Sequence, residues 1–280
     1  MPGILYLVPT PIGNLGDISK RHIEILSEVD FIAAEDTRVS LKLLNHLDIR
    51  KPLVSYHRHN TETAGPAVLG RILNGESCAL VTDAGTPAIS DPGEELVALC
   101  AAQGVELFSI PGPCAAITAL AASGLPTGRF TFEGFLPVHK KNRRAHLDSL
   151  RAEERTMIFY EAPHKLRDTL DDLAKTFGAE RRIALCRELT KLHEEILRTD
   201  LAGAVAHYDA VEPKGEFVLI LEGAAPVAEE EISPELALDR MEQLRRQGLS
   251  LKQAAKQAAE ELSLPKNKLY DLALGKDVEW

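Results

Sequence analysis

Short apolar runs alternate with helical patterns through the first 123 residues, and this alternation constrains the fold more than any other feature. Strands are predicted at 4–8, 30–34, 53–56, 78–81 and 105–110, and apolar residues at helical spacing occupy the segments between them. The strands at 4–8 and 78–81 are continuous apolar runs. Runs without polar alternation are typical of strands buried on both faces of a sheet. The order strand, helix, strand therefore predicts a mostly parallel sheet with crossover helices.

The stretch from Val81 to Gly93, V-T-D-A-G-T-P-A-I-S-D-P-G, follows one of these runs and predicts a rigid loop rich in Gly and Pro. Such loops beyond the carboxyl ends of strands bind ligands in α/β proteins, although a plain strand-to-helix turn is the alternative. Similar loops at 9–14 and 111–116 follow two other strands. None matches the dinucleotide or triphosphate fingerprints, so we expect backbone packed against a compact ligand, or merely short connections.

Three domains are expected from the rest of the chain. Residues 124–128 form a predicted linker, and strands at 130–135, 156–160, 183–186 and 217–221 with a helix at 165–177 predict a second, mixed α/β domain. A Pro- and Glu-rich connector at 224–232 precedes three short helices, one of which begins with a Ser250–Gln253 capping box. The fold class is α/β, with domains at 1–124 and 125–225 and a small helical domain at 233–280.

Composition limits the cellular compartment and the kinds of binding partner that we expect. The 280 residues carry a formal charge of -10, and the four cysteines are scattered as in a reducing compartment. We expect a cytoplasmic protein without a membrane segment, because no signal peptide and no apolar run of about 20 residues is visible. An acidic chain needs a local basic patch to bind nucleic acid, and the densest basic run is His139 to Arg144. A solvated helix face is the alternative reading of that run.

Seven motifs occur in a fixed order between about Ile4 and Gly223: V-P-T-P-I-G-N, A-A-E-D-T-R, S-Y-H-x-H-N, V-T-D-A-G-T-P-x-I-S-D-P-G, I-P-G-P, F-Y-E-A-P-H-K and C-R-E-L-T-K. Together they resemble the S-adenosylmethionine-dependent ribose methyltransferases of small-subunit ribosomal RNA, within the tetrapyrrole methylase superfamily. The three-helix tail is similar to the C-terminal domain of that family.

The resemblance implies two α/β domains of the tetrapyrrole methylase type, with S-adenosylmethionine folded into the interdomain cleft, and a homodimer. It also implies ribosomal RNA or the small ribosomal subunit as partner. Tetrapyrrole-methylating relatives carry G-D-P at 85–87, where this chain has G-T-P, and whether Asp83 replaces the missing carboxylate is left open. The implied cofactor-binding residues are Pro9, Asp83, Gly85, Thr86, Ile89, Cys114, Ala115, Tyr160 and Gly215.

Polar residues at the predicted strand ends are candidates for chemistry on a sugar hydroxyl. Methyl transfer is an in-line displacement that depends mainly on alignment, and a base contributes about 10²–10⁴-fold. The candidates for base or ribose orientation are Glu35, Asp36 and His57. The candidates for substrate binding are Arg38, Asn60, Lys140, Lys141, Arg143, Arg144 and Arg187.

Plainer roles remain open for several of these residues. Glu35 and Arg38 also fit a structural ion pair, and His57 and His59 fit a hydrogen-bonded loop pair. The H-x-H spacing alone is weak evidence for a metal, and we expect none.

The resemblance therefore implies an enzyme that methylates the ribose 2′-hydroxyl of a cytidine in small-subunit (16S) ribosomal RNA. One alternative is a tetrapyrrole-type C-methyltransferase for a small molecule, which Thr86 and the basic run disfavour. The other is a non-catalytic RNA-binding factor in ribosome assembly.

Overall fold

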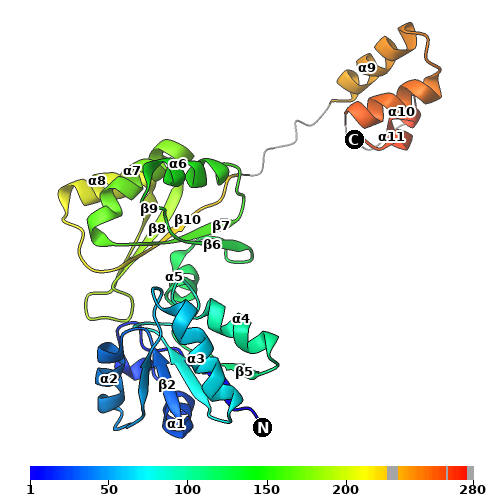
Figure 1. Ribbon diagram of the computed structural model, residues 1–280. Helices are drawn as coiled ribbons and strands as arrows, with labels where there is room; N and C mark the ends of the chain where they lie inside the picture. Colours follow the sequence, from blue (N-terminus) through cyan, green and yellow to red (C-terminus); the bar gives the residue numbers. More distant parts are fainter. Residues whose placement is uncertain (226–232, 263, 276–280) are drawn as a thin grey trace. The chain divides into compact units, whose positions relative to one another are not determined.

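A computed structural model describes residues 1–225, 233–262 and 264–275 of the chain (Figure 1). Residues 1–224 form one compact unit and residues 225–280 form a second. The predicted division of the first unit near Gly124 stays a prediction. Most of the predicted connector at 224–232 and the last five residues of the predicted tail domain lie outside the described residues.

The first half of the larger unit is built on a parallel five-stranded sheet of order β3-β2-β4-β1-β5, which confirms the predicted alternation. Its strands are β1 (Ile4–Leu7), β2 (Phe31–Ala34), β3 (Leu53–Ser55), β4 (Cys78–Val81) and β5 (Glu106–Ser109). Its helices are η1 (Leu15–Asp17), α1 (Lys20–Glu28), α2 (Thr37–His46), α3 (Thr61–Leu73) and α4 (Glu94–Ala102).

Both faces of this sheet are covered, which explains the unbroken apolar runs. One face packs Phe31, Ala33 and Leu80 against residues of α3 and α4 such as Val68 and Leu96. The other face packs Ile32, Ala34 and Val81 against residues of α1 and α2 such as Leu26 and Leu44. The central strands β2 and β4 are therefore buried along their whole length, whereas the edge strand β5 keeps exposed polar residues at Glu106 and Ser109.

The strand order creates a switch point between β1 and β4. From β1 the chain passes through α1 to β2 on one side of the sheet, and from β4 it passes through α4 to β5 on the other side. Where neighbouring strands send their connections in opposite directions, a crevice opens at their carboxyl ends. The loops that follow β1 and β4 therefore meet there.

The second half is built on a five-stranded sheet of order β6-β7-β10-β8-β9, in which only β6 and β7 run parallel. The mixed sheet was predicted. Its strands are β6 (Phe130–Phe135), β7 (Thr156–Glu161), β8 (Arg182–Arg187), β9 (Glu195–Asp200) and β10 (Phe217–Leu221). Its helices are α6 (Lys140–Ser149), η2 (Pro163–Lys165), α7 (Leu166–Phe177) and α8 (Leu201–Ala210).

Helix α5 (Ala115–Ser123) follows β5 of the first sheet but packs on the second sheet. Ala116, Ala119 and Leu120 lie against Ile158 of β7 and Val218 of β10. The opposite face of the second sheet is covered by α6, α7 and α8 (Figure 1). The chain thus crosses from one sheet to the other within a single short helix.

The smaller unit contains α9 (Pro234–Arg246), α10 (Leu251–Glu261) and α11 (Lys266–Ala273), as the sequence predicted. Its own core includes Met241, Leu244, Ala255 and Leu269. The predicted Ser250–Gln253 capping box starts α10. None of the helices in the described ranges is long and apolar enough to cross a membrane.

Candidate functional site

A pocket lies at the switch point of the first sheet and continues onto the second sheet. Its wall combines apolar residues from both sheets with Asp91, Tyr160 and Glu216 as polar groups. The lining residues are Ile12, Ala84, Gly85, Thr86, Ile89, Asp91, Cys114, Ala115, Tyr160, Cys186, Leu189, Glu216 and Val218.

Three loops are tied together to form the first-sheet side of the pocket. The N–H of Thr10 donates to the Gly85 carbonyl over 2.9 Å, and the Gly85 N–H donates to the Thr10 carbonyl over 3.0 Å. The Thr86 hydroxyl donates to the Pro113 carbonyl over 2.9 Å. The loops after β1, β4 and β5 therefore form one connected surface, although they are distant in sequence.

Gly85 and its neighbours adopt backbone conformations that few side chains tolerate. Gly85 has φ +83°, and a Cβ atom there would lie 3.2 Å from Cγ2 of Ile12. Ala88 and Ser90 both have φ +66°, which costs a non-glycine residue about 1–2 kcal/mol. Such conformations persist only where surrounding contacts impose them, so this loop has a defined shape.

Tyr160 of β7 connects the pocket wall to the start of α5. Its hydroxyl accepts a hydrogen bond from the Ala116 N–H over 3.1 Å. Phe132 and Phe135 contact its ring edge-on, with centroids 5.1 and 5.5 Å away. Burial raises the pKa of Tyr160 to about 12, so the phenol stays protonated near neutral pH.

Carboxylates gather around Thr82, at the end of β4. The Thr82 hydroxyl donates to Oε2 of Glu35 over 2.6 Å, and Oδ1 of Asp83 accepts from the Asp36 N–H over 3.1 Å. Burial, with Glu35 adding its negative charge, raises the pKa of Asp83. The same two causes raise the pKa of Asp91 to about 6. This wall is acidic, and it lacks enough nearby positive charge to stabilise all its carboxylates.

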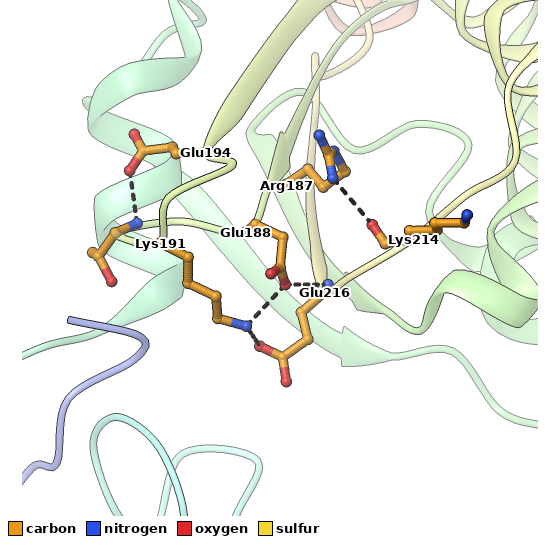
Figure 2. Close-up of polar contacts among 7 residues, drawn as sticks. Arg187, Glu188, Lys191, Glu194, Lys214 and Glu216 are labelled. Carbon is orange, nitrogen blue, oxygen red and sulfur yellow. Dashed lines mark hydrogen bonds and ion pairs between the residues drawn. The ribbon is translucent and has the colours of Figure 1, made fainter.

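The second-sheet side of the pocket carries a compensated cluster of charges (Figure 2). Nζ of Lys191 lies 2.8 Å from Oε1 of Glu188 and 2.9 Å from Oε2 of Glu216. Burial raises the pKa of Glu188, but hydrogen bonds from Lys191 and the Glu216 N–H outweigh burial and hold this pKa below its usual value. Gly215 makes room for Glu188, because a Cβ atom there would lie 2.4 Å from its Cγ.

The predicted catalytic residues Glu35, Asp36 and His57 do not line the pocket. Glu35 accepts the Thr82 hydrogen bond. Asp36 is the N-cap of α2, and the Arg38 guanidinium binds its carboxylate over 2.6 and 3.0 Å and lowers its pKa. The N–H of His57 donates to Oδ1 of Asn60 over 2.8 Å. The predicted structural alternative for Arg38 is thus present, with Asp36 as its partner in place of Glu35.

The basic run proves to be the first turns of α6, and its members face different surroundings. Lys140, Lys141 and Arg144 are exposed. Arg143 is 9% exposed, and its Nε donates to Asp172 over 2.6 Å and its Nη2 to Thr169 over 2.7 Å. These contacts give the Arg143 guanidinium structural partners, and its predicted role in binding RNA stays a prediction.

Arg187, another predicted substrate-binding residue, lies at the end of β8. Its Nε pairs with Glu195 over 2.9 Å, and its Nη1 reaches the Lys214 carbonyl over 3.5 Å (Figure 2).

Six of the nine predicted cofactor-binding residues line the pocket, namely Gly85, Thr86, Ile89, Cys114, Ala115 and Tyr160. Of the other three, Asp83 and Gly215 directly precede the lining residues Ala84 and Glu216, and Pro9 precedes Thr10, which is hydrogen-bonded to Gly85. Sequence reasoning missed the polar lining residues Asp91 and Glu216. Asp91 stands in the S-D-P-G end of the conspicuous loop, which was a usable signal, and no pattern marks Glu216.

Among the described residues, no group of three or more His, Cys, Asp or Glu side chains is arranged to hold a metal ion.

Comparison with protein families identifies two parts of the chain. Residues 4–205 match the Tetrapyrrole (Corrin/Porphyrin) Methylases, and residues 230–277 match the RsmI C-terminal HTH domain. A curated relative from Synechocystis, named ribosomal RNA small subunit methyltransferase I, is 50% identical and covers 97% of this chain and 98% of its own length. A relative of the same name from Escherichia coli O157:H7 is 47% identical and covers 97% of this chain and 95% of its own length.

Solved structures share the fold at lower identity. Diphthine synthase aligns with a TM-score of 0.60 at 14% identity, covering 79% of this chain and 90% of its own. Uroporphyrin-III C-methyl transferase from Thermus thermophilus, complexed with S-adenyl homocysteine, aligns with a TM-score of 0.55 at 20% identity, covering 79% of this chain and 97% of its own. The family match, the full-length relatives and the shared fold together show that this chain is a methyltransferase belonging to the tetrapyrrole (corrin/porphyrin) methylase family.

Proposed function

We propose that this enzyme transfers a methyl group from S-adenosylmethionine to the ribose 2′-hydroxyl of a cytidine in small-subunit ribosomal RNA. The observation that carries the proposal is the 50% identity over 97% of the chain to a relative named ribosomal RNA small subunit methyltransferase I. The sequence motifs between Ile4 and Gly223 support the same assignment.

The pocket suits this methyl donor in shape and in charge. S-adenosylmethionine supplies a methyl group on a positively charged sulfur. The carboxylates of Glu35, Asp83 and Asp91 favour a cation beside them and disfavour a polyphosphate. The glycine at position 85 lets the loop backbone approach a ligand closely, and Ile12, Ile89, Leu189 and Val218 supply apolar contacts.

Thr86 separates this enzyme from the tetrapyrrole-type alternative. Its hydroxyl donates to the Pro113 carbonyl and so ties two loops together, where a G-D-P motif would place a carboxylate. The exposed cations Lys140, Lys141 and Arg144 have no evident use with a small substrate. They favour RNA, whose phosphates bind such side chains in a salt-dependent manner.

The remaining partners follow from the substrate. We infer a homodimer that works in the cytoplasm, where ribosomal subunits are assembled. Light scattering coupled to gel filtration measures the oligomeric state, and a monomer at micromolar concentration would contradict the dimer.

Transfer of a labelled methyl group tests the function directly. The enzyme is incubated with methyl-labelled S-adenosylmethionine and, separately, with unmethylated small subunits, naked ribosomal RNA or a porphyrinoid. We expect the label in 2′-O-methylcytidine after digestion of the RNA to nucleosides. A label on a nucleobase would contradict the ribose assignment. A label on the porphyrinoid would support the C-methyltransferase, and no transfer at all would support the assembly factor.

The basic run gives a matched test of RNA binding. Replacing Lys140, Lys141 and Arg144 by Ala removes three exposed cations, so we expect RNA affinity at low salt to fall by roughly tenfold or more. The salt dependence of binding should weaken as well, while affinity for S-adenosylhomocysteine stays unchanged. Arg143→Ala is the control, because it should lower thermal stability through its contacts with Asp172 and Thr169 and leave RNA affinity nearly unchanged. Equal RNA affinity of the triple variant and the wild type would refute this role.

A further inference from the structure

Asp91 is a carboxylate that lines the pocket beside Thr86, Ile89 and Tyr160. It belongs to the shaped loop after β4, in which Ser90 has φ +66°. Nη2 of Arg58 donates to the Ser90 carbonyl over 3.0 Å and fixes the backbone just before Asp91. The loop that carries Asp91 in the pocket wall is therefore held in a defined shape.

The other acidic candidates near the pocket are engaged or lie outside its lining. Glu216, the second carboxylate of the described lining residues, is paired with Lys191 at 2.9 Å. Asp36 is held by Arg38. Glu35 accepts the short hydrogen bond from Thr82 and does not line the pocket. Asp91 is left as a lining carboxylate that forms no salt bridge with another described residue.

The surroundings of Asp91 favour its protonated form more than water does. Burial removes solvent from the carboxylate, and the negative charges of Glu35 and Asp83 act in the same direction. Arg58 opposes them, and the Tyr160 phenol faces Asp91 in its neutral form. The pKa of about 6 leaves Asp91 mostly ionised at neutral pH but able to hold a proton far better than an ordinary aspartate.

Thr82 interacts with both Glu35 and Asp91. Its hydroxyl has a single hydrogen, which it donates to Glu35 over 2.6 Å. The same hydroxyl also interacts with the Asp91 carboxylate, and this interaction lowers the pKa of Asp91 and so opposes the effect of burial. Thr82 therefore favours the ionised Asp91 carboxylate, which is the form that can accept a proton.

We propose that Asp91 is the catalytic base, which accepts the proton of the ribose 2′-hydroxyl during methyl transfer. The assignment rests on the proposed function. As the hydroxyl oxygen forms its bond to the methyl carbon, the O–H bond breaks and the proton passes to the Asp91 carboxylate. The bond from the methyl carbon to sulfur breaks, and its electron pair remains on sulfur. The proton later leaves Asp91 to solvent.

Single-turnover rates between pH 5 and 9 test the proposal with Asp91→Asn and Asp91→Glu. The wild-type rate should rise about tenfold per pH unit below pH 6 and then level off. Asp91→Asn should be slower by about 10²–10⁴-fold and lose this acid limb, because its amide cannot accept the proton. Asp91→Glu should recover part of the rate and the limb.

Two measurements that do not depend on turnover accompany the rates. Calorimetry should show that Asp91→Asn binds S-adenosylhomocysteine within about threefold of the wild type, which amounts to less than about 0.7 kcal/mol. Carbon-13 NMR of the carboxyl groups should detect one aspartate titrating near pH 6 that is missing from Asp91→Asn. Asp209→Asn, on the exposed side of α8, is the control and should match the wild type throughout.

Several results would overturn the assignment. A wild-type rate or an unchanged acid limb in Asp91→Asn would do so, and parallel loss of donor binding would make Asp91 a donor-binding residue instead. If Asp91→Asn behaved in one of these ways while the wild type still labelled the 2′-hydroxyl, the proposed function would stand and only the role of Asp91 as base would be wrong. If the wild type labels no ribose hydroxyl, the proposed function itself fails, whatever the NMR titration shows.

Discussion

The two walls of the pocket treat negative charge in opposite ways. On the first-sheet wall, burial and the negative charge of Glu35 raise the pKa values of Asp83 and Asp91. On the second-sheet wall, Glu188 and Glu216 share the ammonium group of Lys191, and the pKa of Glu188 is lowered (Figure 2). The carboxylates of the first wall therefore destabilise the folded protein when they are ionised, whereas the carboxylates of the second wall already have a cation as partner.

This difference in charge compensation suits the first-sheet wall to binding and chemistry and the second-sheet wall to structural support. Carboxylates that lack a cation of their own attract a positively charged ligand and can exchange protons near neutral pH. Carboxylates that are paired hold a loop in place. The paired wall also touches the other wall, because a Cβ atom at Gly13 would lie only 2.4 Å from Cγ of Lys191. We therefore expect changes on the first wall to alter ligand binding and chemistry, and changes on the second wall to alter stability.

The largest effect is expected from Gly85→Val on the first wall. Valine is strained at φ +83°, and its Cβ would press against Ile12. We expect affinity for S-adenosylhomocysteine, measured by calorimetry, to fall by roughly 100-fold, or about 2.7 kcal/mol. Gly70→Val is the matched control, because no atom lies within 4 Å of the Cβ position in α3. Normal binding by the Gly85 variant would remove the loop from the ligand site.

A smaller effect, on stability, is expected from Lys191→Met on the second wall. The variant leaves Glu188 without its cation, so the free energy of unfolding should fall by about 1–3 kcal/mol at pH 7 in urea titrations. The folded-state pKa of Glu188 is lowered, so this contribution exists above its unfolded value and disappears as the pH falls through the folded one. The variant and the wild type should therefore converge at acid pH, once the pH has fallen below the folded-state pKa of Glu188.

Lys214→Met is the control for this change. Its partner Glu212 is 3.1 Å away, and both side chains are almost three-quarters exposed, so the pair contributes little. If Lys191→Met were as stable as this control, the second wall would not be a supporting one.

The smallest effect has the opposite sign. The pKa of Asp91 is raised from 3.8 to about 6, so its folded form holds a proton that the unfolded chain releases. Stability from that proton is complete below about pH 3.8 and is lost as the pH rises through 6. Asp91→Asn keeps the neutral form at every pH, so it should be more stable than the wild type by about 1 kcal/mol at pH 8, after allowance for solvent screening.

Thermal unfolding followed by circular dichroism at pH 4 and pH 8 measures this gain. The two proteins should unfold at the same temperature at pH 4. Asp36→Asn provides the contrast, because the pKa of Asp36 is lowered and its loss should destabilise the protein at pH 8. If Asp91→Asn were less stable than the wild type at pH 8, the ionised Asp91 carboxylate would not destabilise the folded protein.

Much of the first sheet could be predicted from sequence, because strands buried on both faces have no polar positions to obscure the pattern. The second sheet was harder. Strand β9 (Glu195–Asp200) reads E-I-L-R-T-D and lies at an edge, so it lacks a buried apolar run, and neither it nor α8 was predicted. Edge strands follow the pairing offered by a neighbour, which local sequence does not contain.

The site shows the same limit at single residues. Arg143 and Leu147 stand four apart and face inward together on α6, but the partners of Arg143 lie on α7, 26 and 29 residues further along the chain. Asp83 and Asp91 are equally visible in the loop motif. Only the left-handed turns at Ala88 and Ser90, which no composition rule predicts, bring Asp91 into the pocket wall.

Helix α5 has a practical consequence for dissecting the enzyme. A fragment that ended at the predicted boundary after Gly124 would carry Ala116, Ala119 and Leu120 with nothing to cover them, since the surface that buries them belongs to the second sheet. It should therefore aggregate when expressed alone. Splitting the gene just before Cys114 instead keeps the apolar helix α5 in the same fragment as the second sheet that buries it. We expect two fragments divided at this point to reassemble when they are mixed.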